Sequence, residues 1–457
     1  MMNEVVHGRS TRSAGRTLRP AYFAVVAGIS CALALASPAA ASEASTPVGV
    51  TSGARMAAIG DFYDARGGTP IWLTAGQHEP ASRLIALVAS AELDGLDPGQ
   101  FDIRALKKAV RRAEDGDRAD VARADRMLSA AFLRYVAALR EVDSGEWKFI
   151  DREAAPRAPQ VSVLLRQAAA TGSLDSFLET MPWMHENYAP LRRSLADARD
   201  RGDRTTEARI RVNLERTRGL PATGRYVLVN TAAQRLYMVD DGKVVDWMKV
   251  VVGKPHQQTP MMAALIRYTA VNPYWNVPAD LAAERIAPNV VNQGLSYLRR
   301  AGYVVLSDWT NDAEVVDPST IDWEAVAAGE VEIRVRQKPG PGNAMGRMKF
   351  MFPNREGVYL HDTPNKELLN EEARLFSGGC VRLEDAPRLA EWLYGHALKV
   401  PKGGKPEQHV DLEKPVPVYI AYLTAVPSGD QTVFYEDIYG RDAARIAAAQ
   451  ARKVASR

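Results

Sequence analysis

Cysteine is scarce in this sequence: its 457 residues contain two, Cys31 and Cys380. Cys31 lies in an apolar run near the N-terminus that is typical of an export signal, so removal of that signal leaves Cys380 alone. An intramolecular disulfide is then excluded. A lone thiol in an oxidising compartment is either a buried, inert side chain or a reactive nucleophile, and the count does not choose between them.

An excess of charge of either sign is also absent. The chain has 58 Lys and Arg against 55 Asp and Glu, and the four arginines of residues 1–41, opposed there only by Glu4, account for the whole difference. Binding of nucleic acid or of an anionic membrane depends on clustered basic residues. We therefore expect neither as the main partner, and the 46% of hydrophobic residues indicates folded globular domains.

Several catalytic and cofactor motifs are missing. The Gly-x-Ser-x-Gly of serine hydrolases does not occur, and the glycine-rich stretch 340–346 lacks the Lys and the Ser or Thr of a phosphate-binding loop. The seven histidines are scattered, and none has a second cysteine nearby, so no zinc spacing is present. We expect neither a metal nor a cofactor.

The N-terminus has the three parts of a secretory signal. Arginines precede the apolar run 21–36, and the small residues of 37–41 follow it. This order predicts a signal peptide over residues 1–41. An uncleaved anchor is the alternative, because the run falls only just short of a membrane span. No later segment is apolar and long enough to span a membrane, so we expect no integral membrane segment after cleavage.

The remaining chain begins with a helical half. The chain before about residue 220 places apolar side chains at helical spacing, for instance over 125–139, where Asp125 is a candidate N-cap. The pattern predicts that this half is helical.

The second half is rich in strands. From residue 222 to 425 the sequence alternates as β-strands do, and Asp241-Gly242 predicts a tight hairpin turn. Helical patterns within 278–345 interrupt the strands and indicate an inserted cap, while 426–457 is predicted to be a C-terminal tail. We therefore expect an α+β multidomain protein, in which a β-sandwich-like domain follows the helical one.

One pair of segments has the residues for nucleophilic catalysis. His361 ends a predicted strand, and the chain later reads Ser377-Gly-Gly-Cys380-Val-Arg382. An imidazole beside a thiol can take its proton and stabilise the thiolate. The glycines permit a tight turn that exposes the amides of Gly379 and Cys380 to an oxyanion. Arg382 lies on the same side of an extended strand as Cys380, where it can bind a carboxylate.

The alternative is purely structural. His361 is then a strand-end or core histidine, and Cys380 is a buried apolar residue beside a glycine turn. Spacing alone leaves both interpretations open.

These residues resemble the L,D-transpeptidases with a YkuD-type catalytic domain, whose pattern places a His a short distance before Ser/Thr-His-Gly-Cys. Ser377, Gly379 and Cys380 match that pattern. Further segments are similar to the large, YcbB-like branch of Gram-negative bacteria, among them 250–260, 272–278 and 350–354. Residues 55–215 resemble the helical scaffold domain of that branch.

The resemblance implies a periplasmic acyltransferase that acts on peptidoglycan. It makes Cys380 the nucleophile, His361 the general acid and base, and Gly379 an oxyanion amide together with Cys380. It also implies a set of substrate-binding residues: Arg382, Tyr359, Trp275 and Ser377. The implied reaction transfers the diaminopimelate acyl group of a tetrapeptide stem, with loss of D-Ala, through a thioester to an amine. Peptidoglycan stem peptides are thus the implied partners, and no partner protein is implied.

Two departures from the family pattern stand out. Gly378 occupies the place of the motif histidine, so any hydrogen bond of that imidazole is lost. The stretch 188–221 is also too short for the peptidoglycan-binding module that relatives often have, so substrate retention falls to the cap and the scaffold.

Two other functions remain open at this point. The same thioester resolved by water gives an L,D-carboxypeptidase or a cross-link hydrolase, and the choice depends on how well the cap excludes water. A catalytically silent cell-wall binding protein is the third possibility.

Overall fold

The computed structural model describes residues 49, 51–74, 78–142, 145–310, 312–399 and 404–455. The predicted signal peptide lies outside these residues. Across the part that is described, no helix has both the length and the apolar character needed to cross a membrane.

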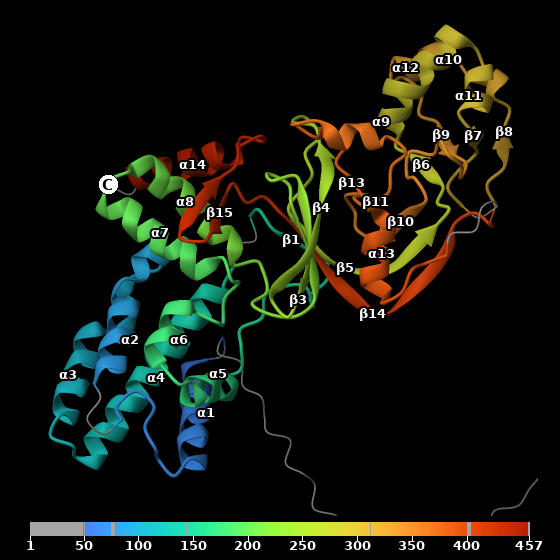
Figure 1. The fold of residues 1–457 in the computed structure, drawn as a ribbon. Coiled ribbons are helices and arrows are strands. Elements are labelled where there is room, and N and C mark those ends of the chain that lie inside the picture. Colours follow the sequence, from blue (N-terminus) through green and yellow to red (C-terminus); the bar gives the residue numbers. More distant parts are fainter. Residues whose placement is uncertain are drawn as a thin grey trace, which may run out of the picture. The chain divides into compact units, whose positions relative to one another are not determined.

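The described chain from Ser52 to Thr217 is mostly helical, as its apolar spacing predicts, and contains one short strand, β1 (Lys148–Phe149) (Figure 1). The helices share one apolar core, to which α1, α2, α4, α5 and α7 contribute most of the buried side chains. They are α1 (Ser52–Ala65), α2 (Glu79–Ala89), η1 (Ala91–Asp94), η2 (Pro98–Phe101), α3 (Ile103–Ala113), α4 (Arg118–Arg140), α5 (Val161–Ala170), α6 (Leu174–Thr180), α7 (Tyr188–Asp200) and α8 (Arg204–Thr217).

Asp125 is not a helix cap, contrary to the prediction. Helix α4 begins at Arg118 and is capped by Asp117. Asp125 lies inside this helix, fully buried, and its carboxylate accepts hydrogen bonds from the backbone N–H groups of residues 71–73 at 2.7–3.0 Å. The Tyr63 hydroxyl donates to the same carboxylate. Asp125 thus satisfies three buried backbone N–H groups in the segment that follows α1.

The second half of the described chain forms a sheet-rich domain. Its strands follow the order β1-β5-β10-β11-β13-β4-β3-β2-β14, with β12 beside β4. They are β1 (Lys148–Phe149), β2 (Tyr226–Asn230), β3 (Arg235–Asp240), β4 (Lys243–Gly253), β5 (Met262–Val271), β10 (Met348–Met351), β11 (Leu360–His361), β12 (Leu375–Ser377), β13 (Val381–Leu383) and β14 (Gln408–Ala421). The predicted hairpin at Asp241-Gly242 is confirmed between β3 and β4.

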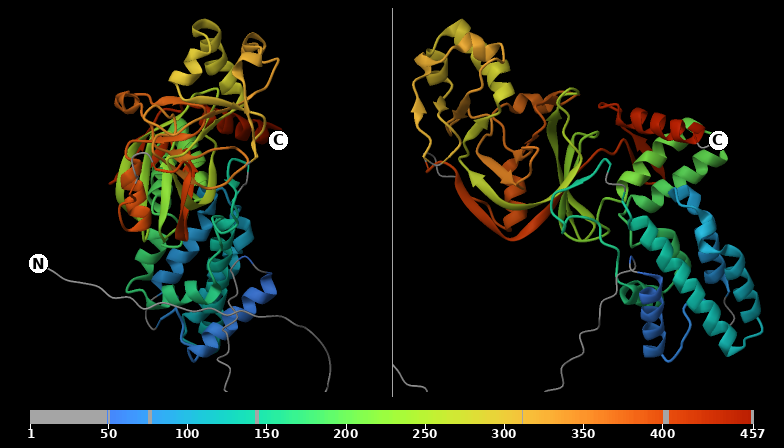
Figure 2. Two further views of the ribbon diagram at one scale, coloured as in Figure 1. Left: turned by 90° about the vertical axis from the view of Figure 1, so that its right-hand side faces the viewer. Right: turned by 180° about the vertical axis from the view of Figure 1, so that it is seen from behind.

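This sheet closes on itself. Strand β14 pairs with β2 along one edge and with β5 along the other, so the path of strands returns to β5 (Figure 2). The pairs β11–β13, β12–β4 and β14–β2 are parallel, which makes the sheet mixed. Helix α13 (Ala386–Tyr394), capped by Asp385, places Leu389 in the same apolar core as Phe350 and Val381. The short turn η5 (Lys366–Asn370) lies between β11 and β12.

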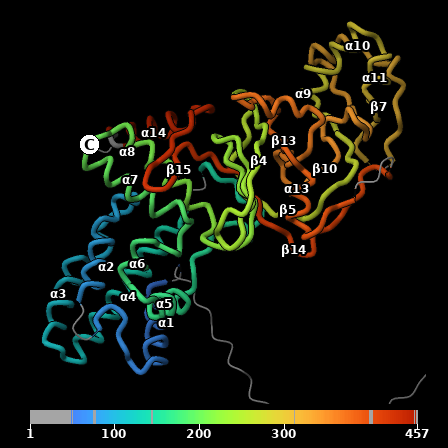
Figure 3. The backbone as a smooth tube through the Cα atoms, in the orientation of Figure 1, coloured from blue at the N-terminus to red at the C-terminus, as the bar shows by residue number. Residues whose placement is uncertain are grey.

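The path of the chain between β5 and β10 can be followed in Figure 3. This segment forms a smaller sheet with the order β6-β9-β7-β8 and has an apolar core of its own. We call these residues, 275–337, the cap. Its elements are β6 (Trp275–Val277), α9 (Ala279–Leu281), the π-helical turn η3 (Ala282–Ile286), α10 (Ala287–Gln293), α11 (Ser296–Arg300), β7 (Tyr303–Leu306), β8 (Val315–Val316), η4 (Pro318–Thr320), α12 (Trp323–Ala327) and β9 (Arg334–Gln337).

The chain after β14 contains regular secondary structure. Strands β15 (Ala425–Ser428) and β16 (Gln431–Phe434) form a hairpin, and helix α14 (Arg441–Ala455) follows. The Thr432 hydroxyl donates to Ser194 on α7 at 2.9 Å, and Arg445 pairs with Glu215 on α8 at 3.3 Å. This C-terminal segment therefore packs against helices from the first half of the chain.

We expect Asp125→Ala to lower the free energy of unfolding by about 3 kcal/mol or more, because it leaves three buried amides without an acceptor. Urea denaturation measures the change. Asp64→Ala is the matched control: the Asp64 side chain is exposed and forms a surface ion pair with Arg126 at 3.3 Å. Its removal should cost less than about 1 kcal/mol. Equal losses in the two variants would contradict the role given to Asp125.

Candidate active site

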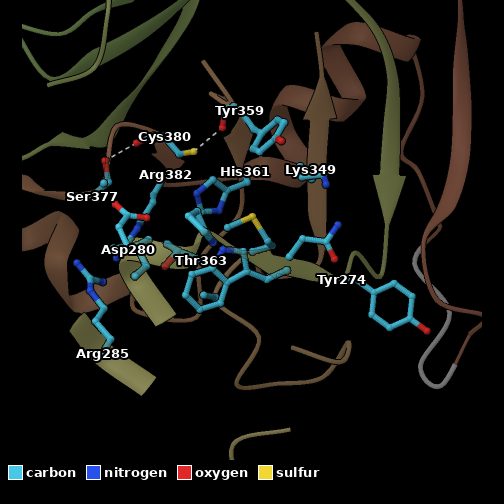
Figure 4. A pocket seen from close by; sticks show the side chains of 18 of the residues that line it. Tyr274, Asp280, Arg285, Lys349, Tyr359, His361, Thr363, Ser377, Cys380 and Arg382 are labelled. Carbon is cyan, nitrogen blue, oxygen red and sulfur yellow. Dashed lines mark hydrogen bonds between the residues drawn. The ribbon is translucent and has the colours of Figure 1, made fainter. Parts of the chain in front are cut away.

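Two short strands bring the candidate catalytic residues to one face of the sheet. Strand β11 pairs in parallel with β13, so that His361 lies opposite Arg382. Alternate residues of a strand face the same side, and Tyr359 and Cys380, two residues earlier on each chain, therefore share this face. All four side chains line one cavity (Figure 4). The predicted placement of Arg382 beside Cys380 follows from this alternation.

The loop of residues 377–380 carries Cys380, the predicted nucleophile, and we call it the nucleophile loop. Its own serine closes it. The Ser377 hydroxyl donates to the Cys380 carbonyl at 2.5 Å and accepts from the Gly379 N–H at 3.2 Å. Gly379 has a φ of +113°, a conformation that residues with a side chain rarely adopt. The glycine is therefore required by the turn that presents Cys380 at the start of β13.

The two amides expected to bind an oxyanion differ in this loop. The Gly379 N–H is already bonded to Ser377, and Gly379 is buried. The Cys380 N–H has no hydrogen-bond partner among the described residues, and Cys380 lines the cavity. The geometry thus leaves Cys380 as the available donor and gives Gly379 a conformational role, which differs from the expectation for Gly379.

His361 is held as a neutral imidazole. It is buried, and its Nδ1 lies 2.6 Å from the Asp362 carbonyl oxygen, which can only accept a hydrogen bond. Nδ1 therefore carries the proton, and Nε2 keeps its lone pair. Burial and the nearby Arg382 guanidinium lower the pKa of His361 to about 3. At neutral pH this side chain is a base without a proton on Nε2.

Cys380 is held as a thiol. Its Sγ donates a weak hydrogen bond to the Gly357 carbonyl at 3.5 Å (Figure 4). Burial raises the pKa of the Cys380 thiol, although the Tyr359 backbone and the cations Arg382 and Lys349 act in the opposite direction. The resting pair is therefore a thiol and a neutral imidazole rather than a preformed ion pair.

The cavity has a volume of about 700 Å³, and its walls come from both the closed sheet and the cap. The cap contributes Trp275, Asp280 and Arg285, and the sheet contributes Lys349 and Arg382. The Arg382 Nε is buried without a hydrogen-bond partner among the described residues. An unpartnered guanidinium in a cavity wall is suited to bind a carboxylate.

The predicted substrate-binding residues have different surroundings. Trp275 and Tyr359 line the cavity, the first from β6 and the second beside Cys380. The hydroxyl of Ser377 is bonded within the nucleophile loop, so its place in the structure is that of a loop-closing residue. The sequence reasoning missed Lys349, which lies opposite His361 on β10 with its ammonium 4.9 Å from the centre of the Tyr359 ring.

Gly378 stands where the family pattern has a histidine. The backbone there is not in the left-handed region, and a Cβ would meet Gln257 Oε1 and Leu281 of the cap at 3.6 Å, an ordinary contact distance. A Cβ atom is therefore compatible with this position.

We expect alkylation of Cys380 by iodoacetamide to be slow at pH 7 and to rise about tenfold per pH unit toward pH 9, because only the thiolate reacts. The raised pKa of Cys380 and the lowered pKa of His361 leave no thiolate–imidazolium pair to react at lower pH. Peptide-resolved mass spectrometry measures the rate and separates Cys380 from Cys31, with Cys380→Ser as the blank. A rate that stays constant from pH 5 to 8 would contradict this assignment.

Two family models and one named relative match parts of this chain. Residues 224–420 match the family model of the L,D-transpeptidase catalytic domain (YkuD), and residues 57–195 match that of the Scaffold domain. A protein of Haemophilus influenzae named "Putative L,D-transpeptidase" is 32% identical over 240 residues, which is 51% of this chain. The match spans about half of that relative's length, 48%. The chain thus belongs to the L,D-transpeptidase family, with a Scaffold domain ahead of its YkuD catalytic domain.

Proposed function

We propose that this protein is a peptidoglycan L,D-transpeptidase that transfers an acyl group through Cys380. The observation that carries the proposal is the pairing of β11 with β13, by which Cys380 and His361 lie on one face of a shared cavity. Beside them is the Cys380 N–H, which has no hydrogen-bond partner in the described part of the chain. A neutral base, a thiol and an amide donor are the groups that acyl transfer through a thioester requires.

In the first step, His361 Nε2 takes the Cys380 proton as Sγ attacks the diaminopimelate carbonyl of a tetrapeptide stem. The Cys380 N–H donates to the oxyanion of the tetrahedral intermediate. The C–N bond to D-Ala then breaks, and the imidazolium gives its proton to the departing amine. A thioester and free D-Ala result.

In the second step, the amine of an acceptor attacks the thioester carbonyl. His361 takes a proton from that amine, the C–S bond breaks, and the thiolate recovers the proton. The product is a new amide, which is a cross-link when the acceptor is another stem peptide. Water in place of the amine gives hydrolysis, the carboxypeptidase outcome.

The charges of the cavity support a stem peptide as substrate. Such peptides end in carboxylates and carry the free amine of diaminopimelate. Arg382 and Arg285 are cations that can bind a carboxylate, and Asp280 and Glu356 can bind an amine. Trp275 and Tyr359 add apolar wall surface for the peptide chain.

Location outside the cytoplasm is part of the proposal. The signal-like segment 1–41 supports export, and peptidoglycan stem peptides are found outside the cytoplasmic membrane. We place the mature protein in the periplasm on these grounds.

The test is the intact mass of the protein after incubation with a carbapenem, whose strained carbonyl stands in for the acyl donor. We expect one covalent adduct on the wild-type chain, none on Cys380→Ala, and acylation slowed at least about 100-fold in His361→Ala, which lacks the base. An adduct that persists in Cys380→Ala would contradict the assigned nucleophile.

Incubation with a disaccharide-tetrapeptide then separates the reaction types. A cross-linked dimer with release of D-Ala supports transpeptidation, and a tripeptide product alone identifies a hydrolase. No adduct and no product from folded protein would leave the cell-wall binding protein as the function.

A further inference from the structure

The orientation of one peptide group decides whether the proposed nucleophile has an oxyanion donor. The carbonyl of Gly379 and the N–H of Cys380 belong to the same peptide unit, and in a planar trans peptide they point in opposite directions. The Thr259 hydroxyl donates to the Gly379 carbonyl at 2.8 Å. Thr259 is fully buried behind the nucleophile loop. This bond turns the Cys380 N–H away from Thr259, toward the cavity that Cys380 lines.

We propose that Thr259 is a positioning residue that sets the oxyanion donor, and that Arg441 and Tyr439 of the C-terminal segment hold it in place. This proposal rests on the acyl-transfer function above. None of these three side chains lines the cavity, so they act through the backbone of residues 377–380.

The support for Thr259 begins at the end of β4. The Gly253 N–H donates to the Thr259 hydroxyl at 2.9 Å, so this hydroxyl accepts one hydrogen bond and donates another. The chain between them folds back tightly: a Cβ on Gly253 would lie 2.1 Å from the Gln257 carbonyl oxygen. The Lys254 N–H also donates to the Ser377 carbonyl at 3.0 Å. The turn 253–259 is therefore bonded to the nucleophile loop at two places. Lys254 bonds to Ser377, and Thr259 bonds to Gly379.

The C-terminal segment holds the other side of this turn. Arg441 donates from Nη2 to the Thr259 carbonyl at 2.9 Å and from Nε to Gln258 Oε1 at 3.0 Å. The Tyr439 hydroxyl donates to the Gly253 carbonyl at 2.7 Å. Both ends of the turn thus receive a hydrogen bond from residues that lie about 180 positions later in the sequence.

Arg441 and Tyr439 are fixed in turn by Tyr422. The rings of Tyr422 and Tyr439 stack with their centres 5.4 Å apart, and the Arg441 guanidinium lies 5.1 Å from the Tyr422 ring centre. The Tyr422 hydroxyl donates to Asp437 at 2.7 Å and accepts from the Tyr439 N–H at 2.9 Å. The guanidinium is consequently held by a face contact and by two directed hydrogen bonds.

This cluster is tied to helix α8. Arg216, which is 1% exposed, donates to Asp442 at 2.5 Å and to the Tyr422 carbonyl at 3.1 Å. The Nη2 atom of Arg216 forms an ion pair with Glu146 Oε1 at 2.9 Å. Hydrogen bonds, together with the contact of the Arg441 guanidinium with the Tyr422 ring, therefore connect α8 through Arg441 and Thr259 to the Gly379–Cys380 peptide.

The test compares two reactions of Cys380, both followed by mass at pH 9. Acylation by a carbapenem passes through an oxyanion, whereas alkylation by iodoacetamide does not. Thr259→Val removes the hydroxyl and keeps the shape of the side chain. We expect its acylation rate constant to fall about 10- to 100-fold, since loss of a single oxyanion donor costs about 100- to 1,000-fold and the released peptide still samples the correct orientation. Alkylation should stay within about twofold of wild type, because the thiol itself is untouched.

Two further variants separate positioning from a general structural effect. Thr259→Ser keeps the hydroxyl and should restore acylation to within about threefold of wild type. Thr269→Val is the matched control, because Thr269 is a fully buried threonine of β5 whose hydroxyl has no hydrogen-bond partner among the described residues. It should leave both rates within about twofold of wild type.

If Thr259→Val does not give a cooperative melting transition, Arg441→Met tests the positioning role instead. This variant keeps an apolar contact with the tyrosine rings and removes both bonds to the turn, and we expect about a tenfold selective loss of acylation. The proposal would be overturned if a folded Thr259→Val were acylated at a rate within twofold of wild type. Where Thr259→Val does not fold, the same result for Arg441→Met would overturn it. An equal loss of acylation and alkylation in the tested variant would also overturn it. Wild-type protein that alkylates and never acylates would instead overturn the acyl-transfer function, and the positioning role with it.

Discussion

The parallel pairing of two very short strands is the constraint on which the site depends. Strand β11 ends at His361, and β13 begins directly after Cys380. Their register places the imidazole and the thiol on one face, and the parallel direction requires the connection to pass through η5 and β12 before it returns. That return ends in the glycine turn of 377–380. The fold therefore places the proposed base on a sheet strand and the proposed nucleophile on a turn between two strands of the same sheet.

Electrostatics and backbone geometry have separate roles here. Burial and neighbouring cations keep His361 as a neutral imidazole, and burial keeps Cys380 as a thiol. In the proposed mechanism, a proton passes between them only when a carbonyl is attacked. In the same proposed mechanism, the oxyanion donor is the N–H of a single peptide, and the hydrogen bonds around that peptide extend to the C-terminal segment. Residues after β14 are thus connected to the chemistry by hydrogen bonds, although they line no part of the cavity.

Local patterns in the sequence predict the parts of the site that lie close together along the chain. Cys380 and Arg382 share a face because alternation within one strand is a local property. The helical first half and the strand-rich second half follow from periodicity in the same way. Lys349 was missed because its place opposite His361 depends on a strand pairing that no local pattern specifies. Thr259 was visible only as part of a segment similar to the family. Asp125 was assigned to a cap because an acidic residue before an apolar run looks the same whether the helix begins there or seven residues earlier.

The structure of the acylated protein tests the central claim most directly. The account predicts an acyl group on Cys380 Sγ with its carbonyl oxygen about 3 Å from the Cys380 nitrogen, and with the Thr259 hydroxyl still bonded to the Gly379 carbonyl. His361 Nε2 should face the thioester from the same side of the sheet. An acyl oxygen bound elsewhere in the cavity, for instance by Arg382, with the Cys380 N–H turned away from it, would contradict the account.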